Sequence, residues 1–494
     1  MQLLSTILAF VRKENADAYL VGGFVRDQFL GRTPARDIDL AIAGNAVALA
    51  RAFADANGGA FYLMDAEHGV ARVLFDQDYA DFADLRGDLH ADLATRDFTV
   101  NALARRCDLL SASPEQLPNQ LRDPRDLIDP FRGLDDLRAR KIRAVSDSVF
   151  QKDPVRLLRA IRQAGELDFT LESETETLVY RDAALLAHAV AERAREEWMK
   201  CLSLPNMLSF LQRLERLGLL AAFLPEISAL KGVAQSPPHE FDVYEHALRV
   251  VAELENIQAG GYTSVANGEF VWQLHSHFSE TLIGGHARAA LLRFAALLHD
   301  VGKPATRTIG ENGKIHFYQH ELRGAEIAAS ILRRMRFSNA ETEMITQIVR
   351  HHLRPLWLAE GPTVSNRATY RYFRATAKVG VDVCALSLAD QRGKRSLIDH
   401  PADLHTRAVI HHLLDRYYHA PEIVVAPPRL IDGKALMEEL KIAPGKRVGE
   451  ILEAIREAQA EGEVKTREDA LALARKILAA GDTKKNFDIA EHRP

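Results

Sequence analysis

Apolar and polar positions follow two different periods along this chain of 494 residues. Up to about residue 135, apolar runs such as AYLVGG, RDIDLAIAG and VARVLF alternate with helix-like stretches, which predicts strands and helices within one unit. From about residue 136 onward, windows such as RLLRAIRQAGEL and LQRLERLGLLAAFL repeat apolar residues every three to four positions, as amphipathic helices do. We therefore predict an N-terminal unit of the α/β or α+β class, followed by an all-α remainder.

Clusters of Pro, Ser and Gly at 111–120, 234–240 and 426–433 predict breaks between helical or strand-rich stretches. A chain of this length favours several domains over one core. We expect four segments: 1–135, 136–233, 234–400 and 401–494. The segment from about 426 onward predicts three short helices, and its pattern leaves open whether they pack on the body or contact RNA.

Composition adds little until the charges are placed along the chain. Apolar residues make up 47% and charged residues 27%, as in ordinary globular proteins, and the net charge of −5 provides no overall positive field for nucleic acid. Residues 138–162, however, contain eight basic and two acidic residues. Such a run is usually a solvated helix face. Its place directly after the α/β unit favours a phosphate-facing role instead.

Cysteine content and hydropathy indicate the compartment. The three cysteines lie far apart and form no CxxC pair, which argues against a disulfide framework and against a thiolate zinc site. The start MQLLSTILAF has no preceding basic residue, unlike a signal peptide, and nothing approaches the ~18 apolar residues of a membrane span. We expect a cytoplasmic protein with no membrane partner.

The clearest candidate chemistry lies in the first 40 residues. An apolar strand runs into Gly22 and Gly23 before a helix, a turn that lets backbone N–H groups approach a phosphate. Asp37 and Asp39 are two apart on a predicted strand and project from one face. Adjacent carboxylates repel unless a divalent cation lies between them, and Mg²⁺ with a nucleoside triphosphate is the usual solution. Asp81 is a candidate third carboxylate, with a solvent-facing strand position as the alternative.

These residues belong to a series of five motifs in a fixed order. The motifs are GGFVRD with DID, RDFTVNALA (96–104), DPFRGLDDL (129–137), KDPVRLLRAIR (152–162) and ERAREEWMKCL (192–202). The series resembles the poly(A) polymerase and tRNA nucleotidyltransferase family, in the bacterial class that includes the CCA-adding enzymes. The resemblance implies an α+β fold, with a polymerase-beta-like mixed-sheet head followed by an elongated all-α neck, body and HD domain. It also implies tRNA as partner, CTP and ATP as substrates, and Mg²⁺ in the head.

The resemblance also assigns roles to single residues. Asp37 and Asp39 would be catalytic and hold the metal ions, and Asn101 would support the neighbouring loop. Asp153 and Arg156 would pair with the Watson–Crick edge of the incoming base, although Asp153-Pro154 also has the pattern of a helix N-cap. Nucleotide binding in the family falls on the positions of Gly22, Gly23, Arg26, Arg96, Asp97, Asp153, Arg156, Arg159 and Arg162.

Several departures from the family pattern leave the added nucleotides open. Lys152 replaces an acidic residue, Thr95 replaces an arginine and Arg132 replaces a glycine. Only about eight residues separate LRG (85–87) from Arg96, where many CCA-adding relatives have a longer flexible segment that helps the switch from C to A. Addition of CCA, of CC only, of A only, or of poly(A) all remain open.

A second constellation lies in the helical part and resembles the HD phosphohydrolase domain. The minimal metal set implied by this resemblance is His246, His299, Asp300 and Asp390, and His320 and His351 resemble the extra ligands of two-metal versions. A lone helical histidine is usually structural, but His-Asp before a glycine, with a histidine upstream and an aspartate downstream, favours a divalent metal site of undetermined identity. A rival hypothesis makes this HD site the working enzyme and the head a nucleotide sensor, which the intact Asp37 and Asp39 disfavour.

Overall fold

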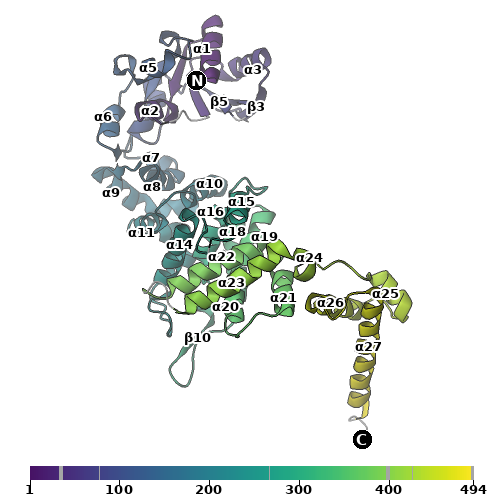
Figure 1. Ribbon diagram of the computed structural model, residues 1–494. Helices are drawn as coiled ribbons and strands as arrows, with labels where there is room; N and C mark the ends of the chain where they lie inside the picture. Colours follow the sequence, from purple (N-terminus) through teal and green to yellow (C-terminus); the bar gives the residue numbers. More distant parts are fainter. Residues whose placement is uncertain (33–36, 77, 266–267, 397–400, 426, 491–494) are drawn as a thin grey trace. The chain divides into compact units, whose positions relative to one another are not determined.

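In the computed structural model, which describes residues 1–32, 37–76, 78–265, 268–396, 401–425 and 427–490, the chain divides into two units. The first consists of Met1–Glu197 with Gln212–Phe223, and the second of Trp198–Leu211 with Leu224–Pro494. Figure 1 follows the chain from purple at the N-terminus to yellow at the C-terminus.

A mixed sheet forms the centre of the first unit. Its strand order is β3-β4-β5-β2-β1-β6, and β2 and β5 run parallel while the other neighbours are antiparallel. The strands are β1 (Ala18–Val21), β2 (Asp37–Ile42), β3 (Ala60–Asp65), β4 (Val70–Phe75), β5 (Asp78–Asp84) and β6 (Ala104–Arg106). The parallel pairing of β2 with β5 places Asp39 directly beside Asp81.

Helices cover this sheet and continue beyond it. Helix α3 packs on β3, β4 and β5, as Figure 1 shows, because its buried Phe53 meets the rings of Phe10, Phe75 and Phe82 at 5.3–5.7 Å. The helices are α1 (Gln2–Lys13), α2 (Gly23–Phe29), α3 (Ala46–Asn57), α4 (Leu89–Ala94), α5 (Leu117–Arg122), α6 (Gly133–Arg138), α7 (Val149–Lys152), α8 (Val155–Leu167), α9 (Ser173–Asp182), α10 (Ala191–Leu202), α11 (Met207–Arg216) and α12 (Leu219–Phe223). Short 3-10 helices are η1 (Thr99–Asn101), η2 (Cys107–Leu109), η3 (Pro124–Asp126) and η4 (Ala183–His188), and β7 (Lys141–Ile142) pairs with β8 (Thr170–Leu171).

The second unit is helical around α22, which is buried on nearly all sides and therefore lacks a polar face. Helices α14, α16, α19 and α23 pack against it. The helices are α13 (Pro225–Ser228), α14 (Val243–Ala259), α15 (Val271–Ser279), α16 (Arg288–Leu298), α17 (Lys303–Thr306), α18 (His320–Arg334), α19 (Asn339–His351), α20 (Arg354–Leu358), α21 (Asn366–Thr376), η5 (Ala377–Val379), α22 (Gly380–Gly393), α23 (Pro401–His419) and α24 (Pro421–Val424).

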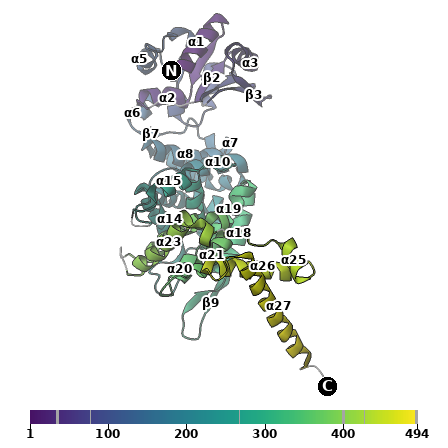
Figure 2. The same cartoon turned by 45° about the vertical axis from the view of Figure 1, so that its right-hand side comes forward.

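The last helices of the second unit have a small core of their own. They are α25 (Gly433–Leu440), α26 (Lys446–Glu461) and α27 (Arg467–Ala490). Leu436, Ile451 and Ala470 are fully buried among them. Helix α26 lies beside α21, as Figure 2 shows, and Arg371 of α21 pairs with Glu457 of α26 at 2.7 Å. Packing on the body is thus observed for the predicted three-helix segment.

The predicted α+β class is confirmed, with the mixed sheet in the head and helices after it. The expectation of helix throughout the remainder was incomplete. Besides β7 and β8, strands β9 (Arg307–Ile309) and β10 (Ile315–Phe317) form a hairpin whose turn contains Asn312 and Gly313. The four predicted domain borders remain a prediction. Among the described residues, no helix combines the length and the hydropathy that crossing a membrane would need.

Candidate active site and metal centre

Three carboxylates meet at one end of the head sheet. Asp37 is exposed at the start of β2, Asp39 is half-buried two residues later, and Asp81 lies opposite Asp39 on β5. Burial raises the pKa of Asp39 to about 6, with Asp37 and Asp81 adding to the rise and Arg96 opposing it. A nearby cation stabilises the ionised form of a carboxylate that burial and like charges otherwise disfavour.

Asp81 has a partner of its own within the sheet. Arg72 on β4 donates from Nε and Nη2 to its two oxygens at 2.7 and 2.8 Å. This bidentate pair directs the Asp81 carboxylate toward β4. The fitting donors for Mg²⁺ are therefore Asp37 and Asp39, with Asp81 as a neighbouring negative charge.

The glycine turn lies against this carboxylate pair. Gly22 has φ of 79°, a left-handed conformation that side chains disfavour. A Cβ placed on it would lie 3.0 Å from Asp39 Oδ2 and 3.3 Å from Arg96 Nη1. Gly22 thus allows Asp39 and Arg96 to approach the backbone at the start of α2. Gly23 follows as the first residue of that helix.

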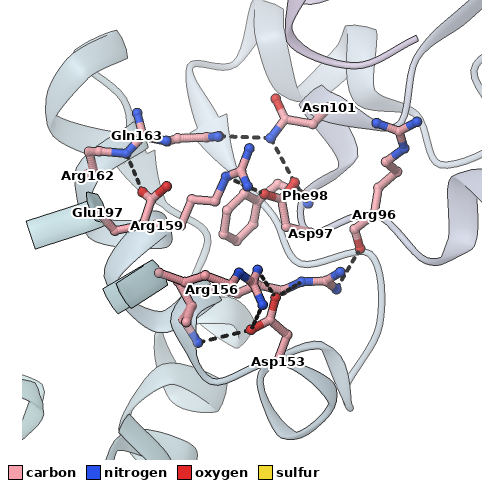
Figure 3. Close-up of polar contacts among 12 residues, drawn as sticks. Arg96, Asp97, Phe98, Asn101, Asp153, Arg156, Arg159, Arg162, Gln163 and Glu197 are labelled. Carbon is pink, nitrogen blue, oxygen red and sulfur yellow. Dashed lines mark hydrogen bonds and ion pairs between the residues drawn. The ribbon is translucent and has the colours of Figure 1, made fainter. Parts of the chain in front are cut away.

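A buried polar network connects the head to α8 (Figure 3). Arg159 Nε lies 2.9 Å from Asp97 Oδ2. Asn101 Nδ2 donates to Asp97 Oδ1 at 2.8 Å and to Gln163 Oε1 at 3.0 Å. Arg26 Nη1 donates in turn to Asn101 Oδ1 at 2.7 Å. Asn101 is therefore the centre of the network, since it contacts Arg26 of α2, Asp97 just before its own 3-10 helix and Gln163 of α8.

Charge distribution in this network keeps Asp97 ionised. Burial would raise its pKa, but Arg159, the Asn101 amide and the Phe98 N–H together bring the pKa below its ordinary value. Arg26, which the resemblance assigned to nucleotide binding, is buried here, and its Nε donates to Asp27 at 2.7 Å. Its guanidinium thus organises the end of α2 beside the glycine turn.

The two base-pairing candidates are fixed by different neighbours (Figure 3). Arg156 donates from Nη2 to Thr95 O at 2.8 Å and from Nη1 to Arg96 O at 3.2 Å. Asp153 accepts from Arg193 Nη2 at 2.7 Å and Nη1 at 3.2 Å. Asp153 also accepts weakly from Val155 N at 3.3 Å, so the expected capping contact exists alongside the ion pair. Pro154, one residue later than expected, is the cap position of α8.

Most of the basic run is paired within its own unit. Arg162, assigned to nucleotide binding, is buried and donates to Glu197 at 2.6 Å and to Glu166. The remaining pairs are Arg138–Asp135, Arg140–Asp168, Arg143–Asp136, Arg156–Asp153 and Arg159–Asp97. Lys141 and Lys152 are exposed. The positive field toward a phosphate backbone is thus weaker than the sequence alone indicates.

A second site lies inside the second unit, where five helices bring imidazoles and carboxylates together. His246 Nε2 is 3.1 Å from Asp390 Oδ1, and His299 Nε2 is 3.1 Å from Asp300 Oδ2. His320 Nε2 is 3.3 Å from Asp300 Oδ1. The ligand atoms of His246, His299 and Asp390 form one group within 4.8 Å, and those of His299, Asp300 and His352 form another.

The ring orientations in this site suit a metal. His299, His320 and His352 each donate from Nδ1 to a backbone carbonyl three residues earlier, at 2.7–2.8 Å. This leaves each Nε2 as the lone-pair atom, and these Nε2 atoms and that of His246 are buried without a hydrogen-bond partner. Convergent unpartnered nitrogens anchored through the opposite ring atom are what a metal-ligating histidine set provides. Burial lowers the pKa of His352 to about 3, which keeps this imidazole neutral.

His351 and His352 are adjacent in sequence but lie in different surroundings. His352 joins the cluster, whereas His351, the predicted extra ligand, lies outside it and its Nδ1 accepts from Arg354 at 3.0 Å. His352 continues the buried stripe of Ile345, Ile348 and Val349, so helical phase was the signal that distinguishes the two.

The histidine site opens into a cavity of about 240 Å³. Three lysines line this cavity, Lys303, Lys314 and Lys394. Lys303 Nζ lies 2.6 Å from Asp300 Oδ2 and donates to Gln235 at 2.6 Å. A metal cluster with lysines around its opening suits a phosphate group.

Sequence reasoning missed several residues of both sites. Gln163 and Arg72 had no motif signal, because a glutamine in an amphipathic helix or an arginine on a strand looks like surface. Arg193 lies in the fifth motif (192–202), but nothing in the motif pointed to Asp153 as its partner. Lys303 follows His-Asp by a few residues and was available as part of HDVGK. The role of each residue can be recognised only from the residue that it pairs with in the structure.

Three family models match separate stretches of the chain. A family model described as "Poly A polymerase head domain" matches residues 18–90, "Probable RNA and SrmB- binding site of polymerase A" matches 168–231, and "HD domain" matches 243–392.

Relatives align over nearly the whole chain. An A-adding tRNA nucleotidyltransferase of Deinococcus radiodurans is 34% identical over 467 residues, covering 93% of this chain and 95% of the relative. A CC-adding tRNA nucleotidyltransferase of Thermus thermophilus is 31% identical over 466 residues and 92% of each chain. A solved CCA-adding enzyme with ATP is 20% identical, with a TM-score of 0.61 over 97% of this chain and 94% of that one, which shows a shared fold.

Proposed function

This chain belongs to the tRNA nucleotidyltransferase and poly(A) polymerase family, in its longer form with an HD domain, and we propose that it adds the two C residues of the tRNA CCA end and stops before the A. It is a nucleotidyltransferase that adds CCA or part of it to tRNA. The proposal concerns which part, and it rests on how Arg156 and Asp153 are positioned.

The head carboxylates support the transfer step. Asp37 and Asp39 would hold Mg²⁺, which when bound neutralises the triphosphate and lowers the barrier for attack by the RNA 3′-hydroxyl. Gly22 and Gly23 have no side chains of their own, so the backbone N–H groups at the start of α2 would be open to the triphosphate beside Asp39 and Arg96. Arg96, beside Asp39, adds positive charge where the leaving pyrophosphate develops its own.

The position of Arg156 favours the addition of only one kind of base. Its two terminal nitrogens are held by the carbonyls of Thr95 and Arg96, directly after α4. Helix α4 is short and packed, with Leu93 fully buried, so the chain directly before Arg96 is held in place. A change from cytosine to adenine would require Arg156 and Asp153 to move against this clamp.

Hydrogen-bond chemistry favours cytosine in that fixed arrangement. Cytosine presents two adjacent acceptors, N3 and O2, and one amino donor, while adenine presents one acceptor and one amino donor. Each terminal nitrogen of Arg156 retains a second N–H for the base, and Asp153 accepts from the amino group. The arginine therefore has two acceptors to satisfy with CTP and one with ATP. Three relatives named CC-adding, at 28–31% identity, support the same choice.

One gel tests the proposal. tRNA transcripts ending before CCA, after C and after CC are incubated with Mg²⁺ and labelled CTP or ATP, and products are resolved at one-nucleotide resolution. We expect the transcript ending before CCA to gain two C residues and the transcript ending after C to gain one. The transcript ending after CC should gain none. Addition of A to the transcript ending in CC would overturn the CC assignment, and ATP extension without a stop would indicate a poly(A) polymerase. Absence of all incorporation would turn attention to the HD site.

A-addition is the second candidate, because the A-adding relative is 34% identical over 93% of this chain. In that case only the transcript ending in CC is extended, by one residue. The same three transcripts therefore separate the two candidates.

We further propose that the HD site hydrolyses a phosphomonoester. Support comes from the unpartnered Nε2 atoms, the two aspartates and the lysines around the cavity. His246, His299, Asp300, His352 and Asp390 would hold a divalent metal, which when bound activates water. Hydrolysis of p-nitrophenyl phosphate with Mn²⁺, Co²⁺ or Ni²⁺ should be lost in His352→Ala and retained in the neighbouring His351→Ala. Equal loss in both variants, or equal retention, would overturn this role of the cluster.

A further inference from the structure

Helix α23 has a stripe of potential metal ligands on its exposed surface, apart from the histidine site described above. His411, Asp415 and His419 recur every fourth residue and therefore share one face of the helix. Glu269, two residues before α15, contacts this face. Its Oε2 lies 2.6 Å from His411 Nε2. Two segments that are 142 residues apart in sequence thus meet through these side chains.

Three of these side chains have the spacing of a ligand set, and His411 adjoins them through its contact with Glu269. One ligand atom each from Glu269, Asp415 and His419 lies within 4.8 Å of the others. His419 Nδ1 is 3.0 Å from Asp415 Oδ1. Two simple surface ion pairs would contribute only about 0–1 kcal/mol each, and the two carboxylates of Glu269 and Asp415 lie close enough to repel one another. A divalent cation between them removes this repulsion.

Phe270 orients the two imidazoles. Its ring lies 5.2 Å from that of His419 and 5.9 Å from that of His411, and it stacks on Tyr418 at 5.4 Å. Phe270 is nearly fully buried and has φ of 61°, a conformation that is strained for a bulky side chain. This strained residue fixes Glu269 and the two histidines relative to one another.

We propose that Glu269, His411, Asp415 and His419 form a zinc site that joins the segment before α15 to α23. Two imidazoles and two carboxylates are four nitrogen and oxygen ligands, which suit tetrahedral Zn²⁺ better than Mg²⁺ or Ca²⁺, since these two prefer oxygen. The cysteines are buried elsewhere and supply no competing thiolate. Bound zinc stabilises the folded second unit, because the unfolded chain does not bring the four residues together.

The zinc content of the full-length chain tests this site. Protein stripped with chelator is loaded with Zn²⁺, desalted and analysed for metal by atomic spectroscopy. The double variant His411→Ala, His419→Ala should hold one zinc ion fewer per chain than the wild type. His275→Ala, which removes an exposed histidine of α15 outside the set, should hold as much as the wild type. Equal zinc content in the double variant and the wild type would overturn the proposal.

Two further readouts exclude a folding artefact and the buried site. Asp415→Asn keeps the shape of the side chain and should weaken zinc binding more than about tenfold in a calorimetric titration. Added zinc should raise the Tm of the wild type and of His275→Ala, but raise it less in the double variant. Visible absorption of Co²⁺-loaded protein should lose a tetrahedral component in the double variant, and identical Co²⁺ spectra would also contradict the site. CTP incorporation by the double variant should match that of the wild type, which shows that the chain folds.

Discussion

The carboxylate site of the first unit and the histidine site of the second differ in how the chain brings their ligands together. Asp37 and Asp39 are neighbours on one strand, and strand pairing sets their geometry. The histidine site takes its ligands from α14, α18, α22 and the ends of α16 and α19, all buried. The head site is partly exposed, which suits a cation that enters and leaves with a triphosphate. The buried nitrogens suit a metal that stays.

The two sites also differ in which groups offset the negative charge of their carboxylates. In the head, like charges and burial raise the pKa of Asp39 to about 6. In the histidine site, burial raises the pKa of Asp300 but His299 and Lys303 bring it well below the usual value. Without metal, the Lys303 ammonium therefore offsets carboxylate charge in the second site, whereas the first site depends on a cation from solution.

The largest effect should come from removing the head carboxylates. Asp37→Ala with Asp39→Ala should lower CTP incorporation at least about 10³-fold, since a catalytic metal contributes several kcal/mol to the transition state. Phosphomonoester hydrolysis by the histidine site should remain. Asp78→Asn, which removes an exposed carboxylate from the same sheet, is the matched control. Incorporation that survives in the double variant would mean that these carboxylates do not hold the catalytic metal.

Gly22→Ala tests whether activity requires the close approach of Asp39 and Arg96 to the glycine turn. A Cβ at Gly22 would lie 3.0 Å from Asp39 Oδ2, and φ there is 79°, so we expect activity to fall about 10²-fold through displaced Asp39 and Arg96. Gly31→Ala is the matched control, because Gly31 has φ of 65° with nothing within 4 Å of a Cβ. If both variants lose activity equally, backbone strain alone explains the loss. Incorporation assays with CTP measure the difference.

The contrast between the sites explains how much the sequence could predict. Local patterns predicted the glycine turn, the Asp37–Asp39 pair and the sheet that holds them, because two residues on one strand need no tertiary information. The sets that depend on helix packing were harder. His351 and His352 are adjacent and of one type, and only the helical phase separates them. Arg162 looked available for nucleotide, but Glu197, 35 residues later, binds it.

Arg193→Ala should separate base selection from catalysis. Arg193 holds Asp153 through two hydrogen bonds and lies outside the carboxylate site, so kcat/KM for CTP should fall about tenfold, since a charge-assisted bond contributes roughly 1.5–3 kcal/mol. Misincorporation of ATP or UTP should rise at the same time. Arg216→Ala, which removes an exposed pair with Glu176, is the control. An unchanged preference for CTP would show that Asp153 needs no such support.

The smallest effect concerns stability, and it tests the difference in charge balance directly. The pKa of Asp39 is raised from 3.8 to about 6, so the folded head binds a proton more readily than the unfolded chain, and stability falls as pH rises from about 4 to 6. Asp39→Asn should therefore raise Tm at pH 8 in EDTA by on the order of 2–6 °C and leave it nearly unchanged at pH 4. Asp78→Asn should change neither value. A Tm of Asp39→Asn equal to that of the wild type at pH 8 would mean that ionised Asp39 is not destabilising, and that the head is as well balanced without its cation as the histidine site.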